Sequence, residues 1–290
     1  MKKEDIVEKF LEQGFLLSPK MLDTLTDDSI ENIFSISKTA NNIVIQEIKK
    51  PKHILKSTNV KEQEKLSPKN FIEYNKTKYD TIKSILLQKT KPISIDKCKQ
   101  NTDATIIGFV IDRTQQGYVI EDTTKKIEIR TSENLQLNSV LGFSGKLKEN
   151  MFFVEKTTFP DIPLDNEIKT TNLTICFSEK HSTKNADILI TLEGKENENT
   201  LVLQTPGKGK LNDIKIISYK PEIPLKKEEC MKFLKYRFIP ETKPNTNFII
   251  KEVPDIFWIV QDEEWIENYK GVTIISTKDM LFDLGNRKKI

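Results

Sequence analysis

The chain has 290 residues, a length that predicts two compact units, because ordinary domains span about 100 to 200 residues. Hydrophobic residues make up 37% and charged residues 31%, and no run approaches the ~18 apolar residues of a membrane span, so we expect a soluble chain. Mixed charges at residues 1–10 do not fit a signal peptide and three scattered cysteines do not form a disulfide framework, which favours a cytoplasmic location. The only histidines, His53 and His181, exclude histidine-rich catalysis.

Residues 1–48 are predicted to form a small helical domain. Ile6, Val7, Phe10 and Leu11 recur at helical spacing, and Ser18 can cap a second helix. A domain of about 50 residues buries little surface, so its apolar face is expected to be completed by another protein.

Positive charge comes almost entirely from lysine, with 42 lysines against four arginines. Residues 48–100 contain fourteen of these lysines and only five acidic residues. Within this stretch, residues 49–68 lack apolar periodicity and predict a solvated linker. The alternative is a basic strap that contacts nucleic acid.

Residues 69–158 predict one helix followed by a barrel. The helix runs from Pro68 to about Gln88, with apolar residues at three- and four-residue steps. Five short strands follow, at 104–113, 117–122, 126–131, 140–147 and 151–156. Five strands in about 55 residues predict a small closed barrel of the OB type.

Residues 159–290 predict a reduced α/β domain after a proline-containing connector at 159–164. Strands are expected at 171–178, 187–192, 200–204, 213–219, 248–252, 256–260 and 271–275, with one helix at 226–237. Few helices separate the first four strands, so the usual crossover layers are missing.

Several segments, in this order, carry a resemblance to a known family: 10–25, 70–86, 105–113, 117–129, 157–164, 231–240, 251–259 and 268–277. Together they resemble the small subunit of archaeal D-family DNA polymerase. The resemblance implies an α+β multidomain protein with a small N-terminal helical domain, an OB-fold β-barrel and a calcineurin-like phosphodiesterase α/β domain.

The phosphodiesterase loops depart from the family pattern. In the family, Asp, His and Asn residues from five loops hold two divalent metals that activate water at a DNA end. The corresponding positions here are Glu179, His181, Lys208, Lys210, Lys220 and Asp262. Because a lysine ammonium is not a metal ligand at neutral pH, we expect no metal, no cofactor and no catalysis. One alternative is a loosely bound ion at Glu179 and His181, with Glu193, Asp262 or Glu263 as a further ligand. The other is a phosphate contact at Lys208 and Lys210.

The resemblance therefore predicts a non-catalytic accessory subunit. Its expected partner is the large catalytic subunit of a D-family polymerase, with DNA reached through that complex, further replication proteins at the N-terminal domain, and no membrane. Candidate contacts are Phe257, Trp258, Trp265 and Tyr269. For Phe257 and Trp258, inside a predicted strand, a place in the core is the favoured alternative.

Two other functions remain open from the sequence. The barrel could bind single-stranded DNA through lysines and stacked aromatic residues, for which it offers Phe109, Tyr118, Phe143, Phe152 and Phe153. The third hypothesis is a surviving metal-dependent 3′-to-5′ exonuclease that depends on His181.

Overall fold

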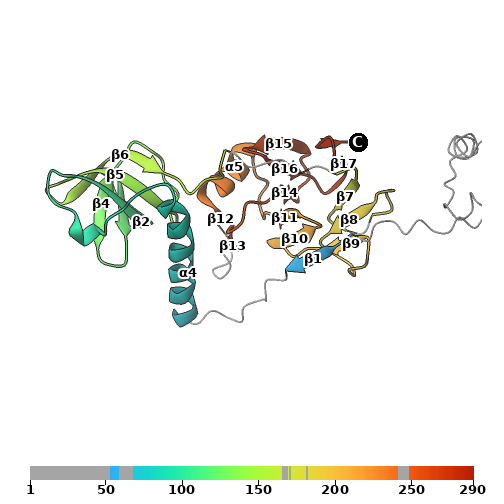
Figure 1. Cartoon of the computed structure of the whole chain (residues 1–290), viewed down its shortest axis with the longest axis horizontal. Coiled ribbons are helices and arrows are strands. Elements are labelled where there is room, and N and C mark those ends of the chain that lie inside the picture. Colours follow the sequence, from blue (N-terminus) through green and yellow to red (C-terminus); the bar gives the residue numbers. More distant parts are fainter. Residues whose placement is uncertain (1–52, 59–67, 165–168, 170, 181, 241–247) are drawn as a thin grey trace, which may run out of the picture. The chain divides into compact units, whose positions relative to one another are not determined.

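The computed structural model describes residues 53–58, 68–164, 169, 171–180, 182–240 and 248–290. The chain divides into two compact units, Met1–Lys52 and His53–Ile290. The predicted helical domain at 1–48 lies outside the described residues. The described part of the second unit is an α+β fold that consists mostly of sheets, with two α-helices (Figure 1). No helix in this part is long and apolar enough to cross a membrane.

Helix α4 (Pro68–Leu87) confirms the predicted helix. It buries Tyr79, Ile82 and Leu86, which pack against Ile107 and Val140 of the following strands. These three residues recur at three- and four-residue steps, so they lie on one side of the helix, and this side attaches α4 to the barrel.

Five strands form a closed barrel in the order β2-β3-β4-β6-β5. They are β2 (Asp103–Arg113), β3 (Tyr118–Glu121), β4 (Lys126–Arg130), β5 (Val140–Lys148) and β6 (Met151–Thr158). Each predicted strand of this region is present, and β4 pairs with β6 in parallel while the other pairs are antiparallel. Gly145 lies at a β-bulge, where any Cβ would come 2.0 Å from the carbonyl oxygen of Phe153, so only glycine fits at this bend.

A tight turn joins β3 to β4, the second and third strands of the barrel. Asp122 Oδ1 accepts hydrogen bonds from the backbone N–H groups of Thr124 (2.7 Å) and Lys125 (2.9 Å), and the N–H of Asp122 donates to the carbonyl of Lys125 (3.1 Å). Burial acts to raise the pKa of Asp122, but hydrogen bonds from the Thr124 hydroxyl and from the backbone N–H groups of Ile95, Lys125 and Thr124 hold it below its usual range.

The C-terminal part contains two larger sheets. The six-stranded sheet has the order β1 (Leu55–Thr58), β10 (Gly207–Leu211), β11 (Ile214–Tyr219), β14 (Ile256–Ile259), β16 (Val272–Ser276) and β15 (Trp265–Tyr269). The five-stranded sheet has the order β18 (Lys288–Lys289), β17 (Asp279–Asp283), β7 (Thr174–Ser178), β8 (Ile188–Thr191) and β9 (Thr200–Val202). A small pair, β12 (Phe238–Ile239) and β13 (Phe248–Ile249), completes the strands.

The central strands β14 and β16 of the six-stranded sheet are buried on both faces, and the alternation of side chains in the sheet shows how. Ile216, Trp258 and Ile275 pack against the five-stranded sheet in one core. Their neighbours along the chain point to the opposite face, where helix α5 (Lys227–Tyr236) covers them with Phe233 and Leu234. Strands buried on two faces read as continuous apolar runs, which is why the sequence identified them.

Six of the described strands were not predicted, and one of them is β12, which directly follows the helix predicted at 226–237. Strand β1 lies within residues 49–68, so the expectation of a solvated linker is wrong for residues 55–58. Strand β10 lies where the resemblance implied a phosphodiesterase loop with Lys208 and Lys210. Strand β15 follows a segment that was expected to be a loop, and β17 and β18 lie beyond the last predicted strand.

Candidate functional site

Parallel pairing brings several loops to one edge of the C-terminal part. Strands β7 and β8 are parallel in one sheet, and β11, β14 and β16 are parallel in the other, so the carboxyl ends within each set point the same way. Contacts between the two sets show that these ends meet. The backbone N–H of Glu179, after β7, donates to the carbonyl of Lys278, after β16 (2.7 Å). Loops at strand ends are where α/β folds usually hold ligands.

Glu179 and Lys220 form the central ion pair of this edge. Lys220 Nζ lies 2.6 Å from Glu179 Oε1, and the glutamate side chain is only 16% exposed. The backbone N–H of Lys220 donates to Thr205 Oγ1 (2.6 Å), which holds the lysine at the end of β11. The ammonium group of Lys220 therefore already lies beside the Glu179 carboxylate, where a bound metal ion would have to lie.

A second pair joins Asp262, after β14, to Lys278. The two side chains lie 2.8 Å apart, and the hydrogen bond from Lys278 to Asp262 raises the pKa of the lysine. Glu179 raises this pKa further through its charge. Lys278 thus stays protonated between two carboxylates.

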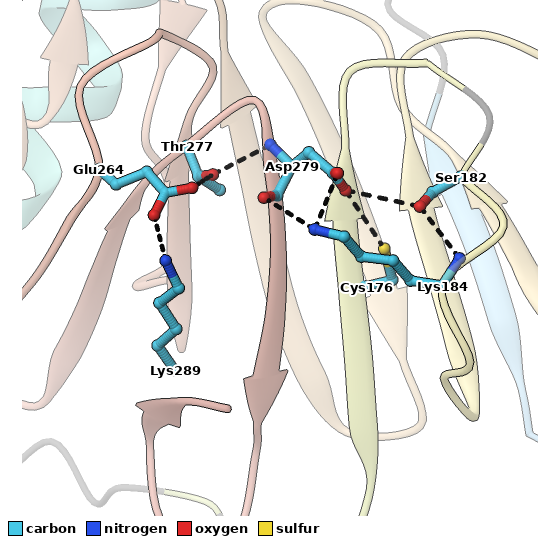
Figure 2. Close-up of polar contacts among 7 residues, drawn as sticks. All are labelled: Cys176, Ser182, Lys184, Glu264, Thr277, Asp279 and Lys289. Carbon is cyan, nitrogen blue, oxygen red and sulfur yellow. Dashed lines mark hydrogen bonds and ion pairs between the residues drawn. The ribbon is translucent and has the colours of Figure 1, made fainter.

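Two more pairs extend the arrangement, as Figure 2 shows. Lys184 Nζ lies 2.8 Å from Asp279 Oδ2, and Lys289 binds Glu264. Thr277 links these pairs, since its hydroxyl donates to Glu264 (3.4 Å) and accepts the backbone N–H of Asp279 (3.0 Å). Each of these four carboxylates is thus paired with a lysine.

Cys176 lies beside Asp279 but does not have the properties of a nucleophile. Its Sγ is 3.8 Å from Asp279 Oδ1, and the residue is 1% exposed. Burial raises the pKa of the thiol, and the Asp279 charge acts in the same direction. The reactive thiolate is therefore disfavoured at neutral pH.

The chemistry available at this edge is limited by these pairs. A divalent cation would have to displace a lysine from each carboxylate it bound, and repulsion from the remaining lysines would oppose its entry. Among the described residues no group of three His, Cys, Asp or Glu side chains is placed to hold a metal ion. His181, the imidazole expected here, lies outside the described residues.

Two of the lysines predicted to replace metal ligands are elsewhere. Lys208 and Lys210 belong to β10 and not to a loop at this edge, so this part of the prediction is wrong. Lys208 Nζ donates to the carbonyl of Ile249 (3.2 Å) and lies 4.6 Å from the centre of the Phe248 ring, and Lys210 pairs with Asp213. The lysines that do occupy the edge include Lys278, which sequence reasoning missed although it lies two residues after the end of β16.

The candidate partner contacts are mostly interior. Phe257 and Trp258 are completely buried, in agreement with their interpretation as core residues. Trp265 is 9% exposed and packs in the core with residues of α5, so this candidate contact is not a surface side chain. Tyr269 is half-buried and donates its hydroxyl proton to Asp161 Oδ1 (2.9 Å). A role for these residues in partner binding stays a prediction.

Most of the barrel aromatics are also interior. Tyr118, Phe143 and Phe152 lie in the barrel core, and Phe109 packs beside the cluster under α4. Phe153 belongs to none of these clusters, and its ring centre lies 5.6 Å from Lys148 Nζ. A stacking platform for successive bases needs several exposed rings, and these five residues do not provide one.

Comparison with protein-family models and with curated proteins identified no relative of this chain. The class of protein that the fold supports is a sheet-rich α+β protein with a closed five-stranded barrel and a pair of larger sheets. Any functional assignment must therefore rest on the residues themselves.

Proposed function

We propose that this chain is a non-catalytic accessory subunit of the type represented by the small subunit of archaeal D-family DNA polymerase, and that it binds a large polymerising subunit. The order of its parts supports the proposal: a helix, a closed five-stranded barrel that we assign to the OB type, and two large sheets that we assign to a degenerate calcineurin-like phosphodiesterase domain. A fold of this kind can lose its catalytic residues and keep the surface that binds a partner, because function resides in the site and not in the fold.

The observation that carries the proposal is the set of four ion pairs at the strand-end edge. Each pair joins a carboxylate to a lysine, namely Glu179 with Lys220, Asp262 with Lys278, Asp279 with Lys184, and Glu264 with Lys289. In this arrangement the carboxylates stabilise local structure and are not available to activate a metal-bound water.

The binding test is co-expression with the D-family large subunit from the same source, followed by size-exclusion chromatography. We expect the two chains to elute together. Ile223, which is 75% exposed, offers a variant within the C-terminal part, and Ile223→Ser is expected to weaken co-elution. Ile93→Ser, at a 42% exposed position before the barrel, is the matched control. Stable separate peaks for the unmodified pair would contradict the proposal.

The accessory-subunit proposal and the exonuclease hypothesis differ in what they predict for the isolated chain. If the chain is a non-catalytic accessory subunit, an end-labelled DNA should remain intact when incubated with the purified protein and manganese. Degradation that His181→Ala abolishes would show that the site is active and that the accessory role is not the whole function.

A further inference from the structure

Three lysines lie directly opposite one another on adjacent strands of the six-stranded sheet. Lys56 on β1 is the register partner of Lys210 on β10, and Lys210 is the register partner of Lys215 on β11. Figure 1 shows β1, β10 and β11 side by side. Directly opposite residues point to the same face with Cβ atoms about 5 Å apart, so these residues form one row, which we call the lysine row.

The lysine row is part of a larger excess of positive charge. Lys208 lies on the same face of β10, two residues before Lys210, and repulsion from Lys251 adds to burial in lowering its pKa. Glu252 lies 2.7 Å from Lys215 Nζ, and that contact, with the charges of Lys208 and Lys210, lowers the pKa of Glu252.

Among the described residues, two carboxylates contact or act on a surface with five lysines, Lys56, Lys208, Lys210, Lys215 and Lys251. Besides Glu252, the second is Asp213, which is 90% exposed and 3.8 Å from Lys210 Nζ. Both pairs are largely solvated, and pairs of this kind contribute little to stability.

The row is unfavourable for the sheet that carries it. Like charges directly opposite on neighbouring strands destabilise a sheet, here at two successive pairings. Uncharged side chains at the same positions would pair better, so stability alone does not explain the row. An anionic ligand that lies along the row would be attracted to each lysine, and this attraction would offset the repulsion between the lysines.

We propose that the lysine row and Lys208 bind the phosphate backbone of a nucleic acid strand. Adjacent strands lie about 4.8 Å apart, so the row spans about 10 Å, the length of about three phosphates at 3.4 Å per nucleotide along a duplex strand. Lysines act as mobile point charges, which suits binding without sequence preference.

A nucleic acid fits this surface better than a membrane. Membrane-binding surfaces combine basic residues with an apolar face that enters the lipid. The outward positions of β10 on this face are both lysines, Lys208 and Lys210. The proposal is independent of the accessory-subunit role, because it involves neither the strand-end edge nor a protein partner.

The segment before the barrel has a part in this surface. Lys56 belongs to β1, which the chain supplies from the stretch predicted as a linker, and the row is complete only when β1 pairs with β10. Binding of a nucleic acid strand should in turn hold β1 on the sheet.

The experiment measures fluorescence anisotropy of a labelled oligothymidine with the full chain over a range of salt concentrations. The test variant carries Lys56→Gln, Lys210→Gln and Lys215→Gln. The control carries Lys126→Gln, Lys146→Gln and Lys148→Gln on the barrel, and removes the same number of charges.

We expect the unmodified chain and the barrel variant to bind alike. In the test variant the slope of log affinity against log salt should fall by about 2, because each neutralised phosphate of a single strand contributes about 0.7. Its melting temperature should be unchanged or higher, since like charges have been removed, and this separates lost binding from lost folding.

A second variant, Glu252→Gln, should act in the opposite direction. It removes the carboxylate that competes for Lys208, Lys210 and Lys215, so the affinity for the oligonucleotide should rise. An unchanged or lower affinity would count against the proposal.

Three outcomes would overturn the inference. One is no binding by the unmodified chain at low salt. Another is binding that only the barrel variant weakens, which would assign the contact to the barrel. The last is sedimentation with phosphatidylserine vesicles that depends on the lysine row, without oligonucleotide binding, which would assign the surface to a membrane.

Discussion

The side chain of Lys78 on α4 is completely buried, and its Nζ has no hydrogen-bond partner among the described residues. The ammonium group lies 3.6 Å from the centre of the Phe238 ring and 5.6 Å from that of Phe109. Attraction to the ring faces compensates for only part of the lost hydration. Burial therefore lowers the pKa of Lys78 from 10.5 to about 7.

This pKa makes a prediction about stability and pH. Between about pH 7 and 10.5 the unfolded chain binds a proton at Lys78 that the folded chain does not bind, so stability rises with pH across this window. Lys78→Met removes the free-energy cost of burying or deprotonating the ammonium group. It should raise the free energy of unfolding at pH 7 by up to about 4 kcal/mol, at 1.36 kcal/mol per pKa unit. The gain should shrink toward pH 10.

Urea unfolding of both proteins at several pH values measures this difference. Lys76→Met, at an exposed position of the same helix, is the control and should leave the pH dependence as it is. A gain for Lys78→Met that is the same at pH 7 and pH 10 would show that the ammonium group is not the cause.

At the scale of the element, β1 depends on a turn in another part of the chain. Asn212, between β10 and β11, accepts the backbone N–H of Ile54 on Oδ1 (3.0 Å) and donates its own N–H to the carbonyl of Ile54 (2.9 Å). Its φ is 52°, a left-handed conformation that asparagine tolerates better than most residues. One residue thus closes the β10–β11 turn and also attaches β1.

Asn212→Gly should separate these two roles. Glycine keeps the left-handed turn but removes the side-chain acceptor, so β1 should pair less firmly, at a cost of about 1 kcal/mol. Hydrogen exchange should become faster at residues 54–58 and stay unchanged in β14 and β16. Asn138→Gly, at a left-handed position in the barrel, is the control, and should leave exchange in β1 unaffected.

The strands that could be predicted differ physically from those that could not. Strands such as β14 and β16 are buried on both faces, so their apolar residues identify them directly. Strand β10 reads Gly-Lys-Gly-Lys-Leu, and β1 reads Leu-Lys-Ser-Thr. They form because a neighbouring strand offers backbone partners, and this long-range contribution leaves no local pattern in the sequence.

The candidate site, like the strands, could be predicted only in part. Glu179 and Lys220 follow strands that the apolar runs located, so their place at a strand end could be foreseen. That Lys220 pairs with Glu179, 41 residues earlier, requires the two sheets to meet. The pairing of Lys184 with Asp279 depends on β17, which was not predicted, so this part of the edge was not foreseen.

For the molecule as a whole, the decisive contact is the core shared by the two large sheets. Trp258 on β14 is completely buried there, with its ring centre 5.4 Å from that of Phe177 on β7. Its Nε1 donates to the carbonyl of Thr277 (3.0 Å), just beyond the end of β16. The same side chain therefore fills the core and fixes the loop that carries Lys278 and Asp279.

Two substitutions of Trp258 should distinguish these contributions. Trp258→Ala leaves a large cavity and should cost about 3 to 5 kcal/mol, a large share of the 5 to 15 kcal/mol that stabilises an ordinary domain. Trp258→Phe keeps most of the packing but removes the hydrogen bond to Thr277, and should cost about 1 to 3 kcal/mol. Thermal and urea unfolding measure both costs. If Trp258→Phe matched Trp258→Ala, the hydrogen bond to the strand-end loop, and not the filling of the core, would be the main contribution, and the stability of the two-sheet core would depend on the edge that carries the four ion pairs.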